Sequence, residues 1–378
     1  MSSRDLLSIG RGGPAALLRL GLPLALLAGL ATIPLLGMAP ELARTLQGFA
    51  AKVLARIGEN VISLTTLPAD YTEKFFILYF LLSFAVAAFA LSREPAEGRG
   101  LLRRLFPWEI YTHRSARVDY GIVLINRVLT PSLLVTRLLS ATAIGSWIGP
   151  QLAALFGPRA PLLSGTAALV AVTVLFALAT DFSDYLQHVL HHRIRLLWEF
   201  HKLHHSAEVM TPLTALRNHP VEQIVGSLVA TPILGVTIGL ASYWLMEAPQ
   251  PITLFGAQLM MVFFYSCCAV HLRHSHVWLS WSPRLSHLVI SPAQHQIHHS
   301  SAPRHWNKNY GNVLAIWDWM FGSLYVPRER ERFALGLAGE QPHPTLLKAY
   351  LEPLAGAVKV ASESMRIRHG VGRGDGNG

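Results

Sequence analysis

Six predominantly apolar stretches of at least 18 residues contain no Asp, Glu, Lys or Arg, and no other feature constrains the fold of this chain as strongly. A helix needs about 20 apolar residues to cross roughly 30 Å of membrane hydrocarbon. Only 14% of the residues are charged, against roughly 25% in an average soluble domain. The sequence therefore predicts an all-α integral membrane protein with about six transmembrane helices. The six stretches are residues 20–40, 75–92, 138–158, 160–180, 223–246 and 248–272.

Two pairs of these stretches follow each other almost directly. Arg159 is the one charged residue between the third and the fourth, and Glu247 is the one between the fifth and the sixth. Pro and Gly residues lie close to both, and such residues end helices. Each pair is therefore predicted to form a tight helical hairpin.

Lys and Arg are distributed unevenly between the two sides that such spans would create. With a cytoplasmic N-terminus, the cytoplasmic segments hold 27 of these residues and the opposite side holds 5. Positive residues accumulate on the cytoplasmic side of membrane proteins. The first stretch could also be a signal peptide, but it lacks a clear small-residue cleavage site, so we expect it to be retained. We expect a multi-pass membrane protein with both termini in the cytoplasm.

The excess of Lys and Arg on the cytoplasmic side explains the net charge of +10. No RNA- or DNA-binding motif accompanies this charge. The two cysteines, Cys267 and Cys268, are adjacent within an apolar run. This arrangement excludes a disulfide framework and a CxxC metal site. We expect neither a nucleic-acid partner nor a cysteine-based centre.

Fifteen of the 18 histidines lie between His188 and His305. Eight of them form three clusters in which neighbours are three or four residues apart, a spacing that places side chains on one face of a helix. The clusters follow the fourth and the sixth apolar stretch, so both would emerge on the cytoplasmic side as a histidine-rich helical cap. The eight residues are His188, His192, His201, His204, His205, His295, His298 and His299.

Eight imidazoles packed together would leave many polar nitrogens unsatisfied unless cations bind them. A closed metal site takes about four ligands, so this number predicts two metal ions with about four or five histidines each. Imidazole suits zinc, copper, iron and nickel, which leaves the metal open. The chain has no His-Glu-x-x-His, phosphate-binding loop or nucleophile motif. We therefore expect no catalytic residue beyond the metal centre and no site for an organic cofactor.

The order HxxxH, HxxHH, HxxHH resembles that of the fatty acid hydroxylase/sterol desaturase superfamily of integral-membrane di-iron oxygenases. Other elements resemble the same superfamily: an acidic–aromatic lead-in before His188, an R-x-H-P-x-E segment, an H-S pair, an S-P pair before His295, an N-Y-G element and a W-D-x-x-F-G-S element. These lie at residues 181–185, 217–222, 274–275, 291–292, 309–311 and 317–323.

The resemblance implies a catalytic domain at residues 119–327, preceded by a membrane region at 1–118 and followed by a partly disordered cytoplasmic tail at 328–378. It also implies two iron ions, O2 as co-substrate and oxidation of an unactivated C–H bond of a lipid. Hydroxylation is favoured, and desaturation on the same site is the alternative. The chain has no flavin, NAD, haem or iron–sulfur motif, so a separate electron donor is expected, such as a ferredoxin or a b5-type protein.

Further ligands and supporting groups are expected close to the clusters. His271 and His274 are additional ligand candidates. A histidine bound to metal normally donates its other ring N–H to a carboxylate or carbonyl, and the candidates for this supporting role are Asp181, Asp184, His219, Glu222 and Asp318. The remaining histidines are expected to be bystanders or hydrogen-bonding residues.

Two other function classes use histidines in membranes. A metal transporter would place ionisable residues along a pathway inside its spans, but the apolar stretches hold almost none. A bis-His haem electron carrier needs only paired histidines, and the HxxHH clusters would leave many unexplained. A Soret band would identify haem, and a di-iron site would lack it.

Overall fold

The structure is a computed structural model, and it describes residues 77–95, 98–132, 140–254, 257–339 and 343–370. By internal contacts the chain divides into one unit of Met1–Leu67 with Arg127–Leu134 and a second unit of Pro68–Asn126 with Val135–Gly378. The described part lies almost wholly in the second unit. The predicted span at 20–40 and most of the predicted region 1–118 lie outside the described residues.

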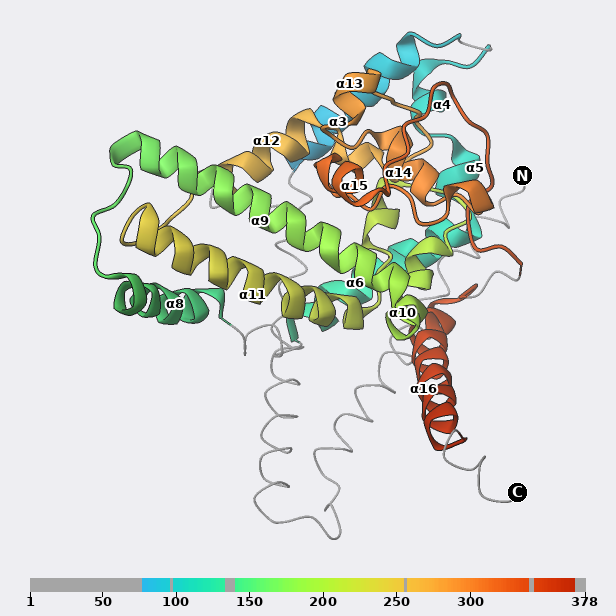
Figure 1. Cartoon of the computed structure of the whole chain (residues 1–378). Coiled ribbons are helices and arrows are strands. Elements are labelled where there is room, and N and C mark those ends of the chain that lie inside the picture. The colour runs from blue at the N-terminus through green and yellow to red at the C-terminus, as the bar shows by residue number, and fades with distance from the viewer. Residues whose placement is uncertain (1–76, 96–97, 133–139, 255–256, 340–342, 371–378) are drawn as a thin grey trace. The chain divides into compact units, whose positions relative to one another are not determined.

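The described chain is mostly helical (Figure 1). Its one sheet is a two-stranded antiparallel pair, β1 (Thr253–Leu254) and β2 (Ala257–Gln258). The helices are α3 (Ile77–Ser92), α4 (Leu101–Leu105), α5 (Trp108–Tyr111), α6 (Arg114–Ser132), α8 (Ala141–Phe156), α9 (Gly165–Arg193), α10 (Arg195–His205), α11 (Pro220–Trp244), α12 (Leu259–Cys267), α13 (Pro283–Ser286), α14 (Pro292–His298), α15 (Ile316–Phe321) and α16 (Leu346–Gly370), with short 3-10 turns at Pro212–Leu216, Val270–Leu272 and Pro303–His305.

Among the described residues, α9 and α11 are long and apolar enough to cross a membrane. At about 1.5 Å per residue, α9 with its 29 residues and α11 with its 25 both exceed the hydrocarbon thickness. Most residues in their apolar windows are not buried in the structure, as expected for helices that face lipid rather than a protein core. Pro220 occupies the first turn of α11, where its missing N–H costs nothing.

Helix α8 packs chiefly along α11, which in turn packs against α9. The α8–α11 contact is close because glycines face isoleucines across it: a Cβ added to Gly145 or Gly235 would overlap Ile238 or Ile144. Small residues spaced by four, such as Gly235 and Gly239, allow helix backbones to approach closely in membranes. The third and fourth stretches were predicted to form a hairpin in which α8 packs on α9. In the structure α8 instead packs chiefly on α11, although α9 follows it in the chain.

The sixth stretch, residues 248–272, does not form one continuous helix. Its described part begins with the extended residues of the β1–β2 pair and continues into α12, which has only nine residues. Pro249 and Pro251 explain why the stretch does not begin as a helix, because proline lacks the N–H that a continuous helix requires. The second and third stretches give α3 and α8, each of 16 residues.

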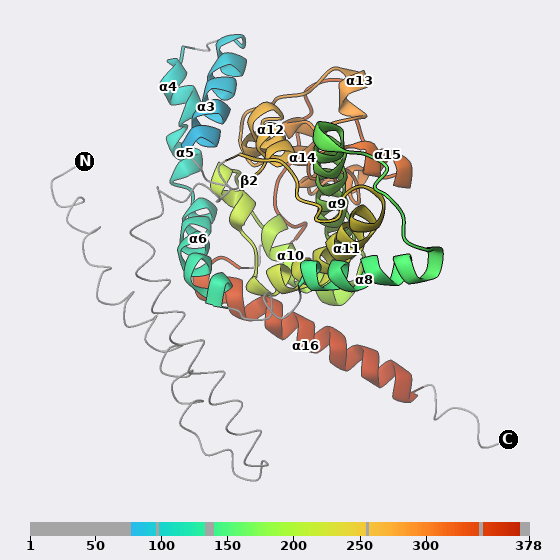
Figure 2. The same ribbon diagram turned by 90° about the vertical axis from the view of Figure 1, so that its left-hand side faces the viewer.

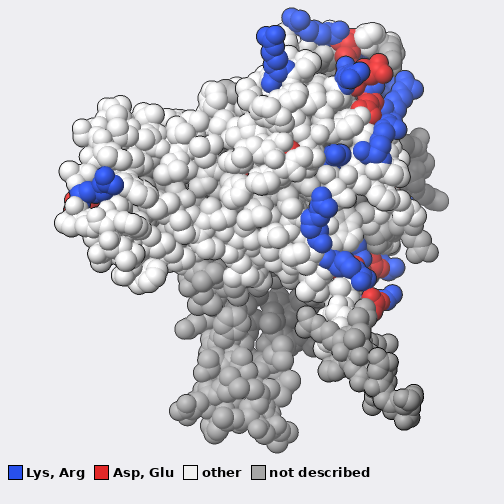
Figure 3. All heavy atoms as spheres, in the orientation of Figure 1, with Lys and Arg blue, Asp and Glu red and all other residues white. Residues whose placement is uncertain are grey.

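Charged side chains avoid the middle of the face drawn in Figure 3. This pale band runs over α9 and α11, while Lys and Arg gather at the end that carries α10 and α16 (Figures 1 and 3). The opposite end is where α8 leads to α9 through Arg159 and where Glu247 follows α11. Such a band is the surface that a helical membrane protein presents to lipid.

Three short segments at this charged end hold the histidines. The last turns of α9 carry the first cluster, and α10 follows after a break at Ile194. Helix α14 carries the third, and Ser291 and Gln294 start it with a reciprocal capping box. Leu203 of α10 is fully buried against α6 and α16, and burial of one such side chain contributes about 2 kcal/mol. Helix α10, which carries the second cluster, is thus fixed by apolar packing against α6 and α16.

Candidate metal centre

Nine of the ten predicted ligand histidines converge in two groups, and the candidate ligand atoms within each group all lie within 4.8 Å of one another. We call them the five-histidine group and the four-histidine group. The five-histidine group is His188, His192, His201, His205 and His298. The four-histidine group is His204, His274, His295 and His299.

In the five-histidine group every Nε2 atom is buried and has no hydrogen-bond partner among the described residues. Three of the rings, those of His188, His201 and His298, form a hydrogen bond through Nδ1, the nitrogen that points away from the centre of the group. His188 donates to the carbonyl of Tyr310 and His298 to that of Lys308, each at 2.7 Å. These bonds fix the tautomer with the proton on Nδ1, which leaves the Nε2 lone pair directed into the group.

In the four-histidine group the Nε2 atoms themselves meet. Nε2 of His274 lies 3.1 Å from those of His204 and His299 and 3.0 Å from that of His295. His295 and His299 are 3.2 Å apart at the same atoms. Four neutral imidazoles cannot all donate to one another, so at least some of these close pairs bring two lone pairs together.

The two groups adjoin each other because adjacent histidines of one helix enter different groups. Within α10, His201 and His205 belong to the five-histidine group, whereas His204 belongs to the other. In the third cluster the assignment is reversed: His298 joins the five-histidine group and its neighbour His299 joins the four-histidine group. The sequence spacing placed the three histidines of each HxxHH motif on one helix face. In the structure the first and last of the three share a group, and the middle one enters the neighbouring group.

Burial keeps the imidazoles uncharged. Desolvation lowers the pKa of His204 and His299 well below the usual histidine value, and neighbouring histidines lower it further. Burial lowers the pKa of His298 to about 4. Neutral imidazole is the form that binds metal ions. The lowered pKa values therefore keep these rings in the neutral form that can bind a metal ion.

Both groups fit a metal ion. Two nitrogens bound at right angles to one metal, each at about 2.1 Å, stand about 3.0 Å apart, close to the separations in the four-histidine group. The buried Nε2 atoms of the five-histidine group lack partners that a cation would supply. An all-nitrogen set accepts iron, zinc, copper or nickel.

His271 and His219, two further candidates, do not join either group. His271 is buried, and its ring lies 5.8 Å from that of Tyr265. His219 is the N-cap of α11, where its Nδ1 accepts from the backbone N–H of Val221. His219 instead acts on the site through Glu222, whose carboxylate accepts its backbone N–H at 2.8 Å.

Among the predicted acids, Glu222 directly contacts a histidine of the five-histidine group. Its Oε2 accepts from Nδ1 of His201 at 2.7 Å, and both side chains are buried. This contact joins the first turn of α11 to α10. It has the form of the carboxylate–histidine pairs that fix ring orientation at metal sites.

Two of the three predicted aspartates, Asp318 and Asp181, accept hydrogen bonds from backbone N–H groups near the site. Asp318 accepts from the N–H groups of Tyr310 and Gly311 at 2.8 and 2.7 Å, and thereby fixes the segment that contains the Tyr310 carbonyl bound by His188. A Cβ at Gly311 would lie 2.6 Å from the carbonyl oxygen of Leu314, so glycine is required for this approach.

Asp181 accepts from the N–H groups of Val313 and Leu314 and from the indole of Trp317. Asp184 accepts from Asn312. Together the aspartates attach the segment after α14 to α9. Four other histidines make separate contacts: His191 with the carbonyl of Gln187, His276 with that of Arg104, His287 with that of Pro283, and His305 with Glu331.

The sequence did not predict a buried ion pair that contacts the end of α10. Arg217 pairs with Asp119 at 2.6 Å, and both are almost fully buried. The same guanidinium donates to the carbonyl of Leu203 and to the hydroxyl of Ser206, which flank His204 and His205. The R-x-H-P-x-E element contained Arg217, but its partner lies 98 positions away in α6, a pairing that no local pattern reveals.

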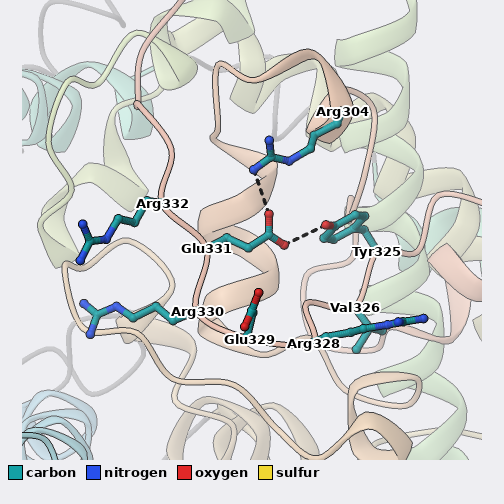
Figure 4. A pocket seen from close by; sticks show the side chains of 8 residues that line it. All are labelled: Arg304, Tyr325, Val326, Arg328, Glu329, Arg330, Glu331 and Arg332. Atoms are coloured by element: carbon teal, nitrogen blue, oxygen red, sulfur yellow. Dashed lines mark hydrogen bonds and ion pairs between the residues drawn. The ribbon is translucent and has the colours of Figure 1, made fainter.

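Two surface cavities lie near the site. One of about 720 Å³ borders Ser275, His276 and Gln296, which are the chain neighbours of His274 and His295. The second, of about 520 Å³, is lined by four arginines (Figure 4). There Glu331 accepts from Arg304 and Tyr325, while Arg328, Arg330 and Arg332 are exposed. Arg332 and Arg330 line both cavities.

Comparison with known proteins agrees with the motif analysis. The chain is 27% identical over 224 residues to the ornithine lipid hydroxylase OlsE of Rhizobium tropici, covering 55% of this chain and 61% of that protein. It is 28% identical over 160 residues to alkylglycerol monooxygenase of Xenopus tropicalis, covering 42% and 31%. It is 27% identical over 163 residues to the Delta(7)-sterol 5(6)-desaturase of Eremothecium gossypii, covering 43% and 40%.

The chain thus spans from about a third to three fifths of the length of these relatives. No solved structure matches it. The family model described as fatty acid hydroxylase matches residues 173–323, which contain all nine histidines of the two groups. The match of residues 173–323 to this family model confirms the resemblance that the histidine motifs predicted.

Proposed function

We propose that this protein is a membrane-bound oxygenase that uses two iron ions to oxidise an unactivated C–H bond of a lipid. The observation that carries the proposal is the pair of adjoining, buried histidine groups with converging Nε2 atoms inside a fatty acid hydroxylase domain. The five-histidine group would hold one iron and the four-histidine group the other.

When bound, the two irons would supply the activation of O2 that C–H oxidation needs. The chain itself holds and orients the rings. The carbonyls of Tyr310 and Lys308 and the carboxylate of Glu222 accept the Nδ1 protons, so that the Nε2 lone pairs are available. Seven of the nine histidines are buried and His188 and His192 are partly buried, which restricts bulk water at the site.

A lipid substrate is supported by what the relatives share. Their names specify an ornithine lipid hydroxylase, an alkylglycerol monooxygenase and a sterol desaturase, whose substrates are all lipids. Two of these three names denote oxygen insertion, and we therefore favour hydroxylation over desaturation.

The proposed topology has about six spans, with both termini and the histidine groups on the cytoplasmic side. The uneven distribution of Lys and Arg, the pale band of Figure 3 and the position of the groups at the charged end of α9 support it. In this arrangement the site stands just outside the bilayer, where a lipid chain can reach it from the leaflet. Cysteines at Pro161 and at Lys359 should be labelled from opposite sides of sealed vesicles; labelling from one side would contradict the topology.

Lipid oxidation of this kind needs two electrons per turnover, so we also propose a separate acidic redox protein as donor. The exposed arginines of Figure 4 offer a positive surface beside the cavity that borders Ser275 and Gln296. Charge attraction would speed association and weaken with salt. Replacing Arg328 and Arg332 with Glu should lower the rate of reduction by a ferredoxin or b5-type protein but leave reduction by dithionite unchanged.

The direct test combines metal and product. The purified protein should contain about two irons per chain without a Soret band, and cells expressing it should gain an oxidised lipid, detected by mass spectrometry, that cells expressing His188→Ala lack. Zinc in place of iron, or identical lipid profiles in the two strains, would contradict the proposal.

A further inference from the structure

Helix α16 has two apolar faces, and the described residues cover one of them. Ala349 and Ala357 are buried on the face directed towards the rest of the unit. On another face, five large apolar side chains are between 44% and 70% exposed. Their spacing of four, three, four and seven residues places them in one line along the helix. This α16 stripe consists of Leu347, Leu351, Leu354, Val358 and Met365.

The position of α16 relative to the long apolar helices limits what can cover the stripe. Helix α16 packs against α10, at the end of α9 that carries the first histidine cluster. Figures 1 and 2 show that it runs crosswise to α9 and α11 rather than alongside them. If α9 and α11 cross the membrane, α16 lies along the membrane surface at the level where they leave it.

The corner between α9 and α10 gives an independent indication of the same level. Ile194 and Leu196 are 44% and 40% exposed there. Between them, Arg195 forms a 3.2 Å ion pair with Glu363 of α16. Exposed apolar side chains beside exposed positive ones are typical of the headgroup region, where apolar residues reach inward and Lys or Arg meets phosphate.

We propose that α16 lies in the cytoplasmic surface of the membrane, with the α16 stripe among the lipid chains and Lys348 and Lys359 at the headgroups. Both lysines are exposed and flank the stripe on the helix surface. Surface helices of this kind bury their apolar face about 5–10 Å into the boundary between headgroups and acyl chains. The inference rests on the membrane placement proposed above, not on the reaction.

This placement has a consequence for the metal centre. Helix α16 packs on α10, and α10 contributes His201, His204 and His205 to the two groups. A surface helix attached to α10 would therefore set the depth of the histidine groups relative to the leaflet from which the substrate comes.

The test uses the full chain in vesicles of phosphatidylcholine and phosphatidylglycerol. An environment-sensitive fluorophore is attached to Leu351→Cys or Val358→Cys, and its quenching by nitroxide-labelled lipid is compared with quenching by a water-soluble reagent. Val236→Cys, on the exposed side of α11, is the control for membrane insertion. Lys359→Cys is the control on the polar side, and the unsubstituted protein corrects for labelling of Cys267 and Cys268.

We expect lipid quenching at residues 351 and 358 to be several-fold stronger than at 359 and comparable with that at 236. If residue 236 is not quenched by lipid, the membrane placement itself is wrong. If residue 236 is quenched but 351 and 358 respond to the water-soluble reagent, α16 does not lie in the membrane surface. Protection of 351 and 358 from both quenchers would also overturn the inference, because another part of this chain, or a second copy, would then cover the stripe.

Discussion

The carboxylate of Glu222 accepts two hydrogen bonds with different consequences: one from Nδ1 of His201 at 2.7 Å and one from the backbone N–H of His219 at 2.8 Å. The second starts α11 through a capping box. The first orients a ring of the five-histidine group. The start of a long apolar helix and the alignment of a candidate metal ligand therefore depend on one side chain.

Replacing Glu222 with Gln should weaken metal binding without abolishing it. The glutamine side chain has one acceptor oxygen, so it can replace only one of the two carboxylate oxygens that accept from His201 and His219. Loss of such a partner typically costs 10–100-fold in metal affinity or activity. Titration with a competing chelator measures the change. Gln223→Ala, at the exposed neighbouring position, should bind metal like the unsubstituted protein, and equal affinity in Glu222→Gln would show that His201 needs no carboxylate.

The two histidine groups should lose metal separately. His192→Ala removes a ring of the five-histidine group only, and His274→Ala removes one of the four-histidine group only. Each variant should retain close to half of the metal, as determined by elemental analysis of folded protein, and neither should form product. His287→Ala is the control, because its ring bonds the carbonyl of Pro283 outside both groups. Unchanged metal content in both variants would contradict two separate sites.

Asp318 should act on His188 through the backbone of Tyr310. Asp318→Asn keeps one acceptor oxygen and should retain most of the metal with reduced activity, whereas Asp318→Ala leaves the N–H groups of Tyr310 and Gly311 without this acceptor and should lose more. Activity and iron content are measured together with a folding check. Complete metal loss in folded Asp318→Asn would make Asp318 a ligand, and unchanged activity in both variants would leave it a purely structural acid.

Breaking the Arg217–Asp119 pair should destabilise the protein strongly. Removing one partner leaves a buried charge uncompensated, which costs about 3–5 kcal/mol. Thermal unfolding in detergent should therefore show a much lower midpoint for Asp119→Ala. The exposed pair Arg114–Glu208 is the matched control, since surface pairs contribute about 0–1 kcal/mol. Similar midpoints for Asp119→Ala and Arg114→Ala would contradict the role assigned to the buried pair.

The histidine spacing was sufficient to predict a site for two metals, because helical periodicity places i and i+4 side chains together whatever the surroundings. It could not assign His204 and His299 to a common group. That pairing arises because α10 and α14 meet at the site. His204 of α10 joins His295 and His299, and His298 of α14 joins His201 and His205.

The sequence by itself determined the histidine motifs and the family resemblance that they carry, the helical character, the two long apolar helices and the ligand residue type. Each of these depends on composition or on neighbours within about one helical turn. Only the tertiary structure decided that α8 packs on α11, that residues 248–272 break into a strand pair and a short helix, and that Glu222 rather than Asp318 contacts a histidine. These features depend on contacts between residues far apart in the chain. Their energies come from close packing and from satisfying buried polar groups, which a local pattern does not encode.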